Sequence, residues 1–142
     1  MLKETVTYED FNGIQRTEDV WFNMSTTDLM QMFNTSDGDP TLKLKNALES
    51  SDMATMLLFF KDFMLKAYGE KSADGRRFVK SEQISEEFSQ TAAFEALFMK
   101  LVNDENGITE FIKGVLPSNL AKEIDVEAAK KQLAGQGVIP MV

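Results

Sequence analysis

Hydrophobic residues recur at helical spacing through most of this chain, and they are densest between residues 51 and 68. At 3.6 residues per turn, Leu58 and Leu65 lie on one side of the expected helix and Phe59 lies on another. Apolar cover this wide predicts burial by several neighbours, supplied either by this chain or by another molecule. The remaining apolar residues share a third side, which carries Met53, Met56, Leu57, Phe60, Phe63, Met64 and Ala67.

Two later stretches also have the spacing of strong helices. The first begins at Ser81 or Ser85 and runs to about Asn103. The second has apolar residues at i, i+3, i+4, i+7 and i+8 from Ile108, and Pro117 ends it. The first is apolar on two adjoining sides, formed by Phe88, Ala92, Met99 and Val102 and by Phe94, Leu97, Phe98 and Leu101.

Weaker helices are expected before and after these. Ser25, followed three residues later by Asp28, has the pattern of a capping box for a helix near 25–33. Short helices are also expected at 41–49 and 125–133.

The ends of the central helix have their own signals. Ser50 or Ser51 is expected to cap its start. Gly69 is expected to end it in the left-handed conformation, before a polar, basic loop that runs to Lys80.

The first part of the chain has the pattern of a β-hairpin. Residues 3–9 are rich in β-branched and aromatic residues, and Asn12-Gly13 is a pair favoured in tight hairpin turns. A two-residue loop would place Val6 opposite Asp19, so the pattern leaves the register open.

The fold class expected from these elements is mainly α, a small helical domain of about five to six helices with an N-terminal β-hairpin. Its length of 142 residues predicts a single domain. Its expected parts are a hairpin at 3–24, a helical core at 25–117, and a weaker helix with an apolar tail at 118–142.

Charge argues against two classes of partner. The net charge is −8, so phosphate backbones and anionic lipid repel the chain, and neither nucleic acid nor a membrane is expected as a partner. The first residues lack the apolar core of a signal peptide, and the longest apolar run, Met56 to Phe60, is too short to span a bilayer. A soluble protein is therefore expected, either intracellular or released by lysis.

Candidate chemistry is scarce. The chain has neither histidine nor cysteine, which removes the usual general base, thiolate chemistry and the commonest transition-metal ligands. The glycines and lysine of residues 69–75 have the wrong order for a phosphate-binding loop. The acidic turns at 37–39 and 104–107 lack the ligand spacing of calcium loops. No catalytic residue, cofactor or metal is expected, and the protein is predicted not to be an enzyme.

Two compositional features point to protein partners instead. The basic loop after residue 69 carries Lys71, Arg76, Arg77 and Lys80, and it suits an acidic partner or the acidic face of another subunit better than nucleic acid. Nine methionines and eleven phenylalanines form either a helical core or an adaptable binding surface, and the sequence leaves both open.

Three stretches resemble the tail assembly chaperones of long-tailed, siphovirus-type bacteriophages. They are VTYEDFNGIQRTEDVWFNMSTTDLMQM, KDFMLKAYGEKSADGRRFVKS and SEEFSQTAAFEALFMKLVNDENGITEFIKGVLP, and they cover most of residues 5–117. The middle stretch is the most telling, since an apolar helix ending in Tyr-Gly-Glu-Lys-Ser is followed by Asp-Gly-Arg-Arg-Phe.

This resemblance implies a non-enzymatic assembly factor with no catalytic residues. Its implied partners are the helical tape measure protein and the major tail protein of the tail tube, together with further copies of itself. Its implied place is the host cytoplasm, outside the mature virion. The alternatives are a permanent virion subunit of the tail tube or connector, and a generic helical protein-interaction domain.

The partner surface is expected on the spare faces of the two most apolar helices. A helical client would lie in an apolar groove between helices. The candidate partner-binding residues are Leu58, Phe59, Leu65, Phe94, Leu97 and Leu101.

Overall fold

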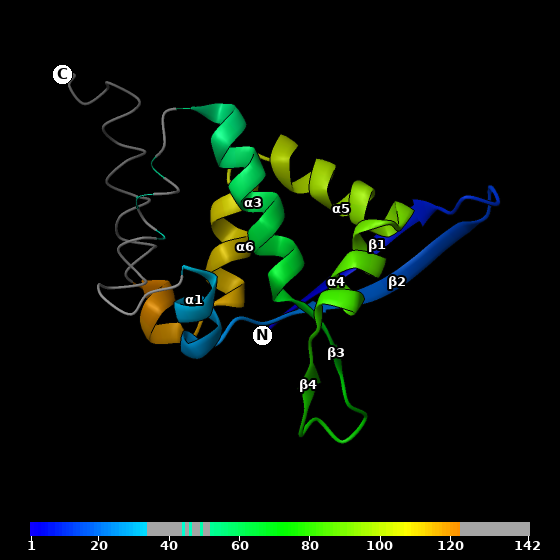
Figure 1. Cartoon of the computed structure of the whole chain (residues 1–142). Helices are drawn as coiled ribbons and strands as arrows, with labels where there is room; N and C mark the ends of the chain where they lie inside the picture. The colour runs from blue at the N-terminus through cyan, green and yellow to red at the C-terminus, as the bar shows by residue number, and fades with distance from the viewer. Residues whose placement is uncertain (34–43, 45, 47–48, 50–51, 123–142) are drawn as a thin grey trace.

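The computed structural model describes residues 1–33, 44, 46, 49 and 52–122 (Figure 1). The expected helix at 125–133 and the apolar tail lie outside the described residues, as does most of the expected helix at 41–49. The strands are β1 (Leu2–Glu9), β2 (Gln15–Phe22), β3 (Tyr68–Lys71) and β4 (Phe78–Val79). The helices are α1 (Thr26–Met32), α3 (Met53–Ala67), α4 (Glu82–Ser89), α5 (Ala92–Asn103) and α6 (Gly107–Val115).

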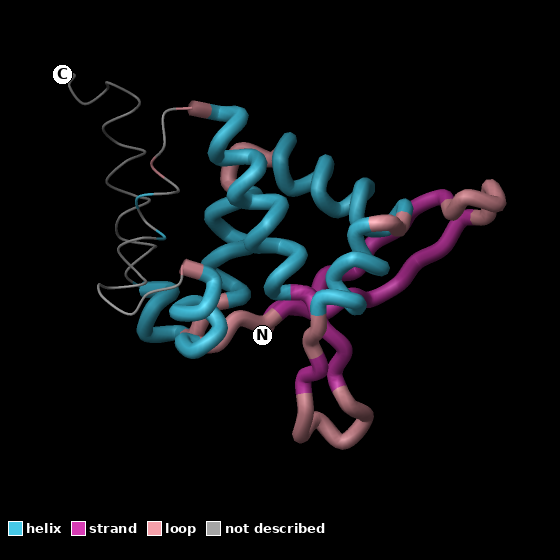
Figure 2. The backbone as a smooth tube through the Cα atoms, viewed as in Figure 1, coloured by secondary structure: helices cyan, strands magenta, loops and turns pink. Residues whose placement is uncertain are grey.

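The strands form a four-stranded antiparallel sheet in the order β1-β2-β3-β4. Its second hairpin, β3–β4, projects away from the helices (Figure 2). The expected fold class, mainly α with one N-terminal hairpin, is therefore wrong, because the protein has a mixed α and β fold. The polar stretch 69–80 was expected to be a loop, but Gly69 pairs with Trp21 of β2, and residues 70–71 pair with residues 78–79.

The first hairpin is present, and its register differs by one residue from that of a two-residue loop. Val6 pairs with Glu18, and Glu9 pairs with Gln15. The Asp10 carboxylate sets the turn, because it accepts hydrogen bonds from the Ile14 amide at 2.9 Å and from Arg16 Nε at 2.6 Å. Gly13 has a φ of +79°, which accounts for a glycine in this turn.

The helices lie against one face of the sheet (Figure 1). Phe22 is fully buried where the two layers meet, and its ring makes edge-to-face contacts with Tyr68, Phe88 and Phe111. The ring of Tyr68 stacks on Phe88 with centroids 3.9 Å apart. These aromatic contacts join β2, β3, α4 and α6 into one core.

The expected boundaries of the long helices change in two places. The stretch 81–103 forms two helices rather than one, because the Thr91 side chain caps α5 by accepting a hydrogen bond from the Phe94 amide. Asp52, rather than Ser50 or Ser51, caps α3. At the other end α3 passes directly into β3, so Gly69 is a strand residue and not a left-handed cap.

Gly69 is required for a different reason. A Cβ at this position would lie 2.6 Å from a ring carbon of Phe78 and 2.7 Å from the carbonyl oxygen of Val79. The bare backbone of Gly69 therefore allows β4 and its side chains to lie close against β3.

The capping box of α1 is present as expected, and its aspartate also bonds to Lys80, which follows β4. Ser25 and Asp28 exchange hydrogen bonds at the start of the helix. The Lys80 ammonium also donates to Asp28, at 2.7 Å. Partial burial raises the pKa of Asp28, but the hydrogen bonds from Lys80 and Ser25 outweigh this effect and hold the pKa below its ordinary value.

We expect Asp28→Asn to reduce the free energy of unfolding by about 1–2 kcal/mol at pH 7, because it removes the ion pair and weakens the cap. A carboxyl whose pKa is lowered in the folded state stabilises the fold above its unfolded pKa, and this contribution is lost as the pH falls through the folded value. Urea denaturation should therefore show a smaller difference between wild type and variant at pH 3 than at pH 7. Asp62→Asn removes an exposed ion pair with Lys66 and should change stability by less than about 0.5 kcal/mol.

Candidate functional site

The six candidate partner-binding residues divide into two groups. On α3, Leu58 is 70% exposed and Leu65 is half-buried. Phe59 is half-buried as well, and its ring stacks on Phe33 with centroids 6.0 Å apart. The α5 candidates are buried in the core of this chain, namely Phe94, Leu97 and Leu101.

Burial of the α5 candidates follows from the packing of that helix. α5 lies along β1 and against α6, so its two apolar sides meet these neighbours. The α5 candidates are therefore held inside this chain and are not available to a partner in this structure. The sequence could not decide this, because helical spacing gives no information on which neighbour covers which side.

Leu58 and Leu65 lie on the outer side of α3, and Asp62 lies between them at helical spacing. This outer side leads into a groove of about 490 Å³ between α1, α3 and α4. The apolar lining of the groove is formed by Met24, Met32 and Leu65. Met24 is fully buried beneath the groove, but Met32 is half-buried, and its flexible side chain can repack around apolar groups of different shape.

Charged residues surround this groove, and they leave it slightly acidic. Two ion pairs lie within its lining, Lys80 with Asp28 and Lys66 with Asp62. Glu82 and Glu86 also line the groove, and they lie one turn apart on α4. A partner helix with lysine or arginine beside its apolar stripe would complement them.

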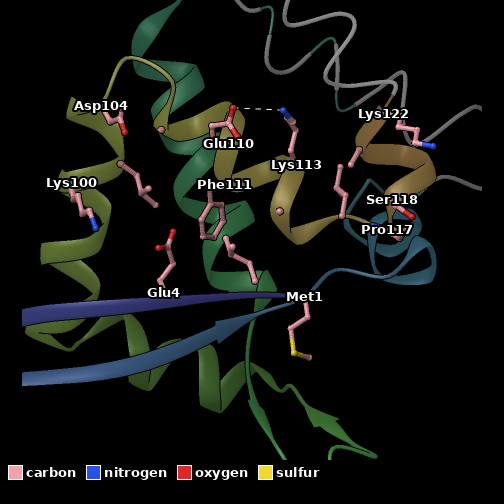
Figure 3. A pocket seen from close by; sticks show the side chains of 16 residues that line it. Met1, Glu4, Lys100, Asp104, Glu110, Phe111, Lys113, Pro117, Ser118 and Lys122 are labelled. Carbon is pink, nitrogen blue, oxygen red and sulfur yellow. Dashed lines mark ion pairs between the residues drawn. The ribbon is translucent and has the colours of Figure 1, made fainter.

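A larger hollow of about 1000 Å³ lies between the start of β1, the end of α5, and α6 with the segment that follows it (Figure 3). Phe111 and Leu101 contribute to its lining, and carboxylates and ammonium groups lie around it. Glu110 and Lys113 form an ion pair at 3.6 Å. The charged lining residues of both signs are Glu4, Lys100, Asp104, Glu110, Lys113 and Lys122.

Sequence reasoning missed several exposed apolar residues. Met53 was placed on the buried side of the central helix, but it is 62% exposed. Phe11 is 84% exposed at the tip of the first hairpin. A two-residue loop at Asn12-Gly13 would place Phe11 in a strand opposite Ile14, so the hairpin pattern did not predict its exposure. In the structure Phe11 lies in a longer turn between the two strands.

Two further features concern metal binding and the membrane. Within the described ranges, no group of three or more acidic side chains is placed to hold a metal ion. Of the helices in the described part of the chain, none combines the length and apolarity that a bilayer crossing requires.

Comparison with known proteins identifies a family. No curated protein and no solved structure has significant similarity to this chain. A family model described as phage tail assembly chaperone matches residues 1–137, almost the whole sequence. Because this model covers almost the whole chain, the protein belongs to the phage tail assembly chaperone family.

Proposed function

We propose that this protein is a non-enzymatic chaperone that binds the helical tape measure protein during phage tail assembly and helps to recruit the major tail protein. It acts in the cytoplasm of the infected bacterium and leaves before the virion is complete. The family supports the role of a tail assembly chaperone. One structural observation supports the binding of a helical client. Leu58, in the middle of the apolar helix α3, exposes 70% of its surface to solvent.

The proposed client site is the outer side of α3 together with the groove between α1, α3 and α4. A client helix places its apolar residues against Leu58 and Leu65 and into the methionine-lined groove. Glu82 and Glu86 beside the groove favour clients with basic residues next to their apolar stripe.

A site of this size binds weakly, and weak binding suits the role. The groove accommodates only a few side chains, so each copy contributes modest affinity. Many copies along a long client protect it together, and each dissociates readily when tail subunits arrive. Association between copies on the client adds to this avidity.

The proposal is tested by co-expression of the chain with the tape measure protein, followed by affinity purification. We expect Leu58→Ser to reduce the amount of client recovered about tenfold, because a leucine buried in an interface contributes about 1.5–3 kcal/mol. Thermal unfolding of the variant should match wild type, since Leu58 lies outside the core.

Met99→Ser is the matched control, because Met99 is an exposed apolar residue, 43% accessible, on a different helix. Its client recovery should equal that of wild type. Equal recovery with Leu58→Ser and wild type, or equal losses in both variants, would exclude the outer side of α3 as the client site.

A further inference from the structure

The face of the sheet opposite the helices carries Trp21, the single tryptophan of the chain. Val20 and Phe22 are buried in the core, so Trp21 between them points to the other face. Lys3 is its partner across the β1–β2 ladder, with the ammonium 5.8 Å from the ring centroid. The ammonium of Lys71, from β3, lies 5.5 Å from the same centroid. We name Lys3, Trp21 and Lys71 the tryptophan platform.

The turn of the second hairpin places two more cations at the end of β3. Its backbone is fixed by hydrogen bonds from the Ser72 amide to the Arg77 carbonyl at 2.9 Å and from the Arg77 amide to the Ser72 hydroxyl at 3.0 Å. The Asp74 carboxylate accepts hydrogen bonds from the Arg76 amide and the Ser72 hydroxyl. The arginines therefore project from a preorganised turn, so little order must be gained on binding.

This region is cationic in a chain whose net charge is −8. In the described part of the chain, neither Arg76 nor Arg77 forms an ion pair with a carboxylate, and Asp74 is engaged by the turn. Asp19 reaches Lys3 only at 4.0 Å, with both side chains about half exposed. The platform and the turn thus present positive charge around an aromatic ring, which complements acidic groups.

The spacing of the two lysines specifies the partner further. The ammonium groups of Lys3 and Lys71 lie 5.8 and 5.5 Å from the same ring centroid, so they are at most about 11 Å apart. An α-helix rises about 10 Å over seven residues, so two acidic residues one heptad apart can reach both ammonium groups. A residue three or four positions after the first would lie between them, over Trp21.

We propose that this face of the sheet binds a helical polypeptide segment with two acidic residues one heptad apart and an apolar residue between them. The carboxylates pair with Lys3 and Lys71, the apolar residue packs on Trp21, and further acidic residues reach Arg76 and Arg77. This surface is separate from the outer side of α3, and the proposal does not depend on tape measure binding.

Trp21 provides the measurement, because its fluorescence reports on the platform alone. The probe is a synthetic alanine- and glutamine-rich helical peptide without tryptophan, with glutamate, leucine and glutamate at i, i+3 and i+7. Titration into the full chain should change Trp21 emission saturably. Replacing both glutamates of the peptide with glutamine should weaken binding about tenfold.

Two double variants separate a local effect from net charge. Lys3→Glu with Lys71→Glu should weaken binding of the probe at least tenfold, because it reverses both charges that the two glutamates contact. Lys100→Glu with Lys122→Glu makes the same change in net charge away from the platform and should leave binding unchanged.

The proposal is overturned if the glutamine peptide binds as tightly as the glutamate peptide, or if both double variants weaken binding equally. Tighter binding of oligouridylate than of the acidic peptide would instead identify a nucleic-acid surface. An emission change that follows protein concentration alone would identify a second copy of the chain as the occupant. Loss of client recovery in Leu58→Ser with unchanged peptide binding leaves this proposal intact.

Discussion

Phe22→Ala should reduce the free energy of unfolding by about 3–5 kcal/mol, the range for a buried phenylalanine truncated to alanine. The Phe22 ring contacts Tyr68, Phe88 and Phe111 with centroids 5.8, 5.9 and 4.9 Å away. Its removal leaves a cavity where the sheet meets the helices, and a rigid core cannot close it. Because stabilities of domains are about 5–15 kcal/mol, this loss is a large fraction of the total.

Urea denaturation checks this expectation, with a lower midpoint and an unchanged slope if the variant still unfolds in one step. Phe11→Ala is the matched control, because Phe11 is 84% exposed at the hairpin tip and should change stability by less than about 0.5 kcal/mol. Similar losses in both variants would mean that the core is not organised around Phe22.

Gly107→Ala should reduce the free energy of unfolding by about 3 kcal/mol, at the upper end of the range for overpacked sites. Gly107 is the first residue of α6, and a Cβ there would overlap the carbonyl oxygen of Leu101. It would also lie 2.9 Å from the Leu101 carbonyl carbon. Both atoms belong to the backbone of α5, and the Leu101 side chain is buried, so neither can move without opening the core.

Gly114→Ala in the same helix is the control. Its Cβ would meet the methyl ends of the Leu2 side chain, the nearest at 3.0 Å, and these can rotate away. Alanine also favours a helix over glycine by about 1 kcal/mol, so the net effect on stability should be small. Chemical denaturation of the two variants side by side distinguishes the backbone overlap from a general intolerance of α6 to larger residues.

The sequence predicts those elements whose signal is local. Ser25 and Asp28 form the expected capping box, because both partners lie within one turn. The central helix occupies Met53–Ala67, within the apolar stretch that predicted it. In both cases neighbouring residues contain the information that fixes the structure.

The elements that were mispredicted depend on contacts between distant residues. β3 and β4 are short. The pairing of β3 with β2 and of β4 with β3 rests on backbone hydrogen bonds, which leave no alternating pattern in Tyr68–Lys71. Gly69 resembles a helix cap in sequence, but the close approach of Phe78 accounts for it. The sequence contains no local sign of this approach.

The prediction of the candidate site was limited in the same way, because burial depends on contacts between distant residues. Helical spacing separates Leu58 and Leu65 from the buried side of α3, and the structure places Leu58 in solvent. The same spacing gave the α5 candidates equal weight, because their burial depends on β1 and α6, which pack against them from other parts of the chain.

The direct passage from α3 into β3 has a mechanical consequence. Ala67 ends the helix and Tyr68 begins the strand, so no linker residue lies between the two elements. A load that tilts α3 is therefore transmitted through the main chain to Tyr68, and through its stacked ring to Phe88 in α4. We therefore expect α3 and β3 to move together when a force is applied to either of them.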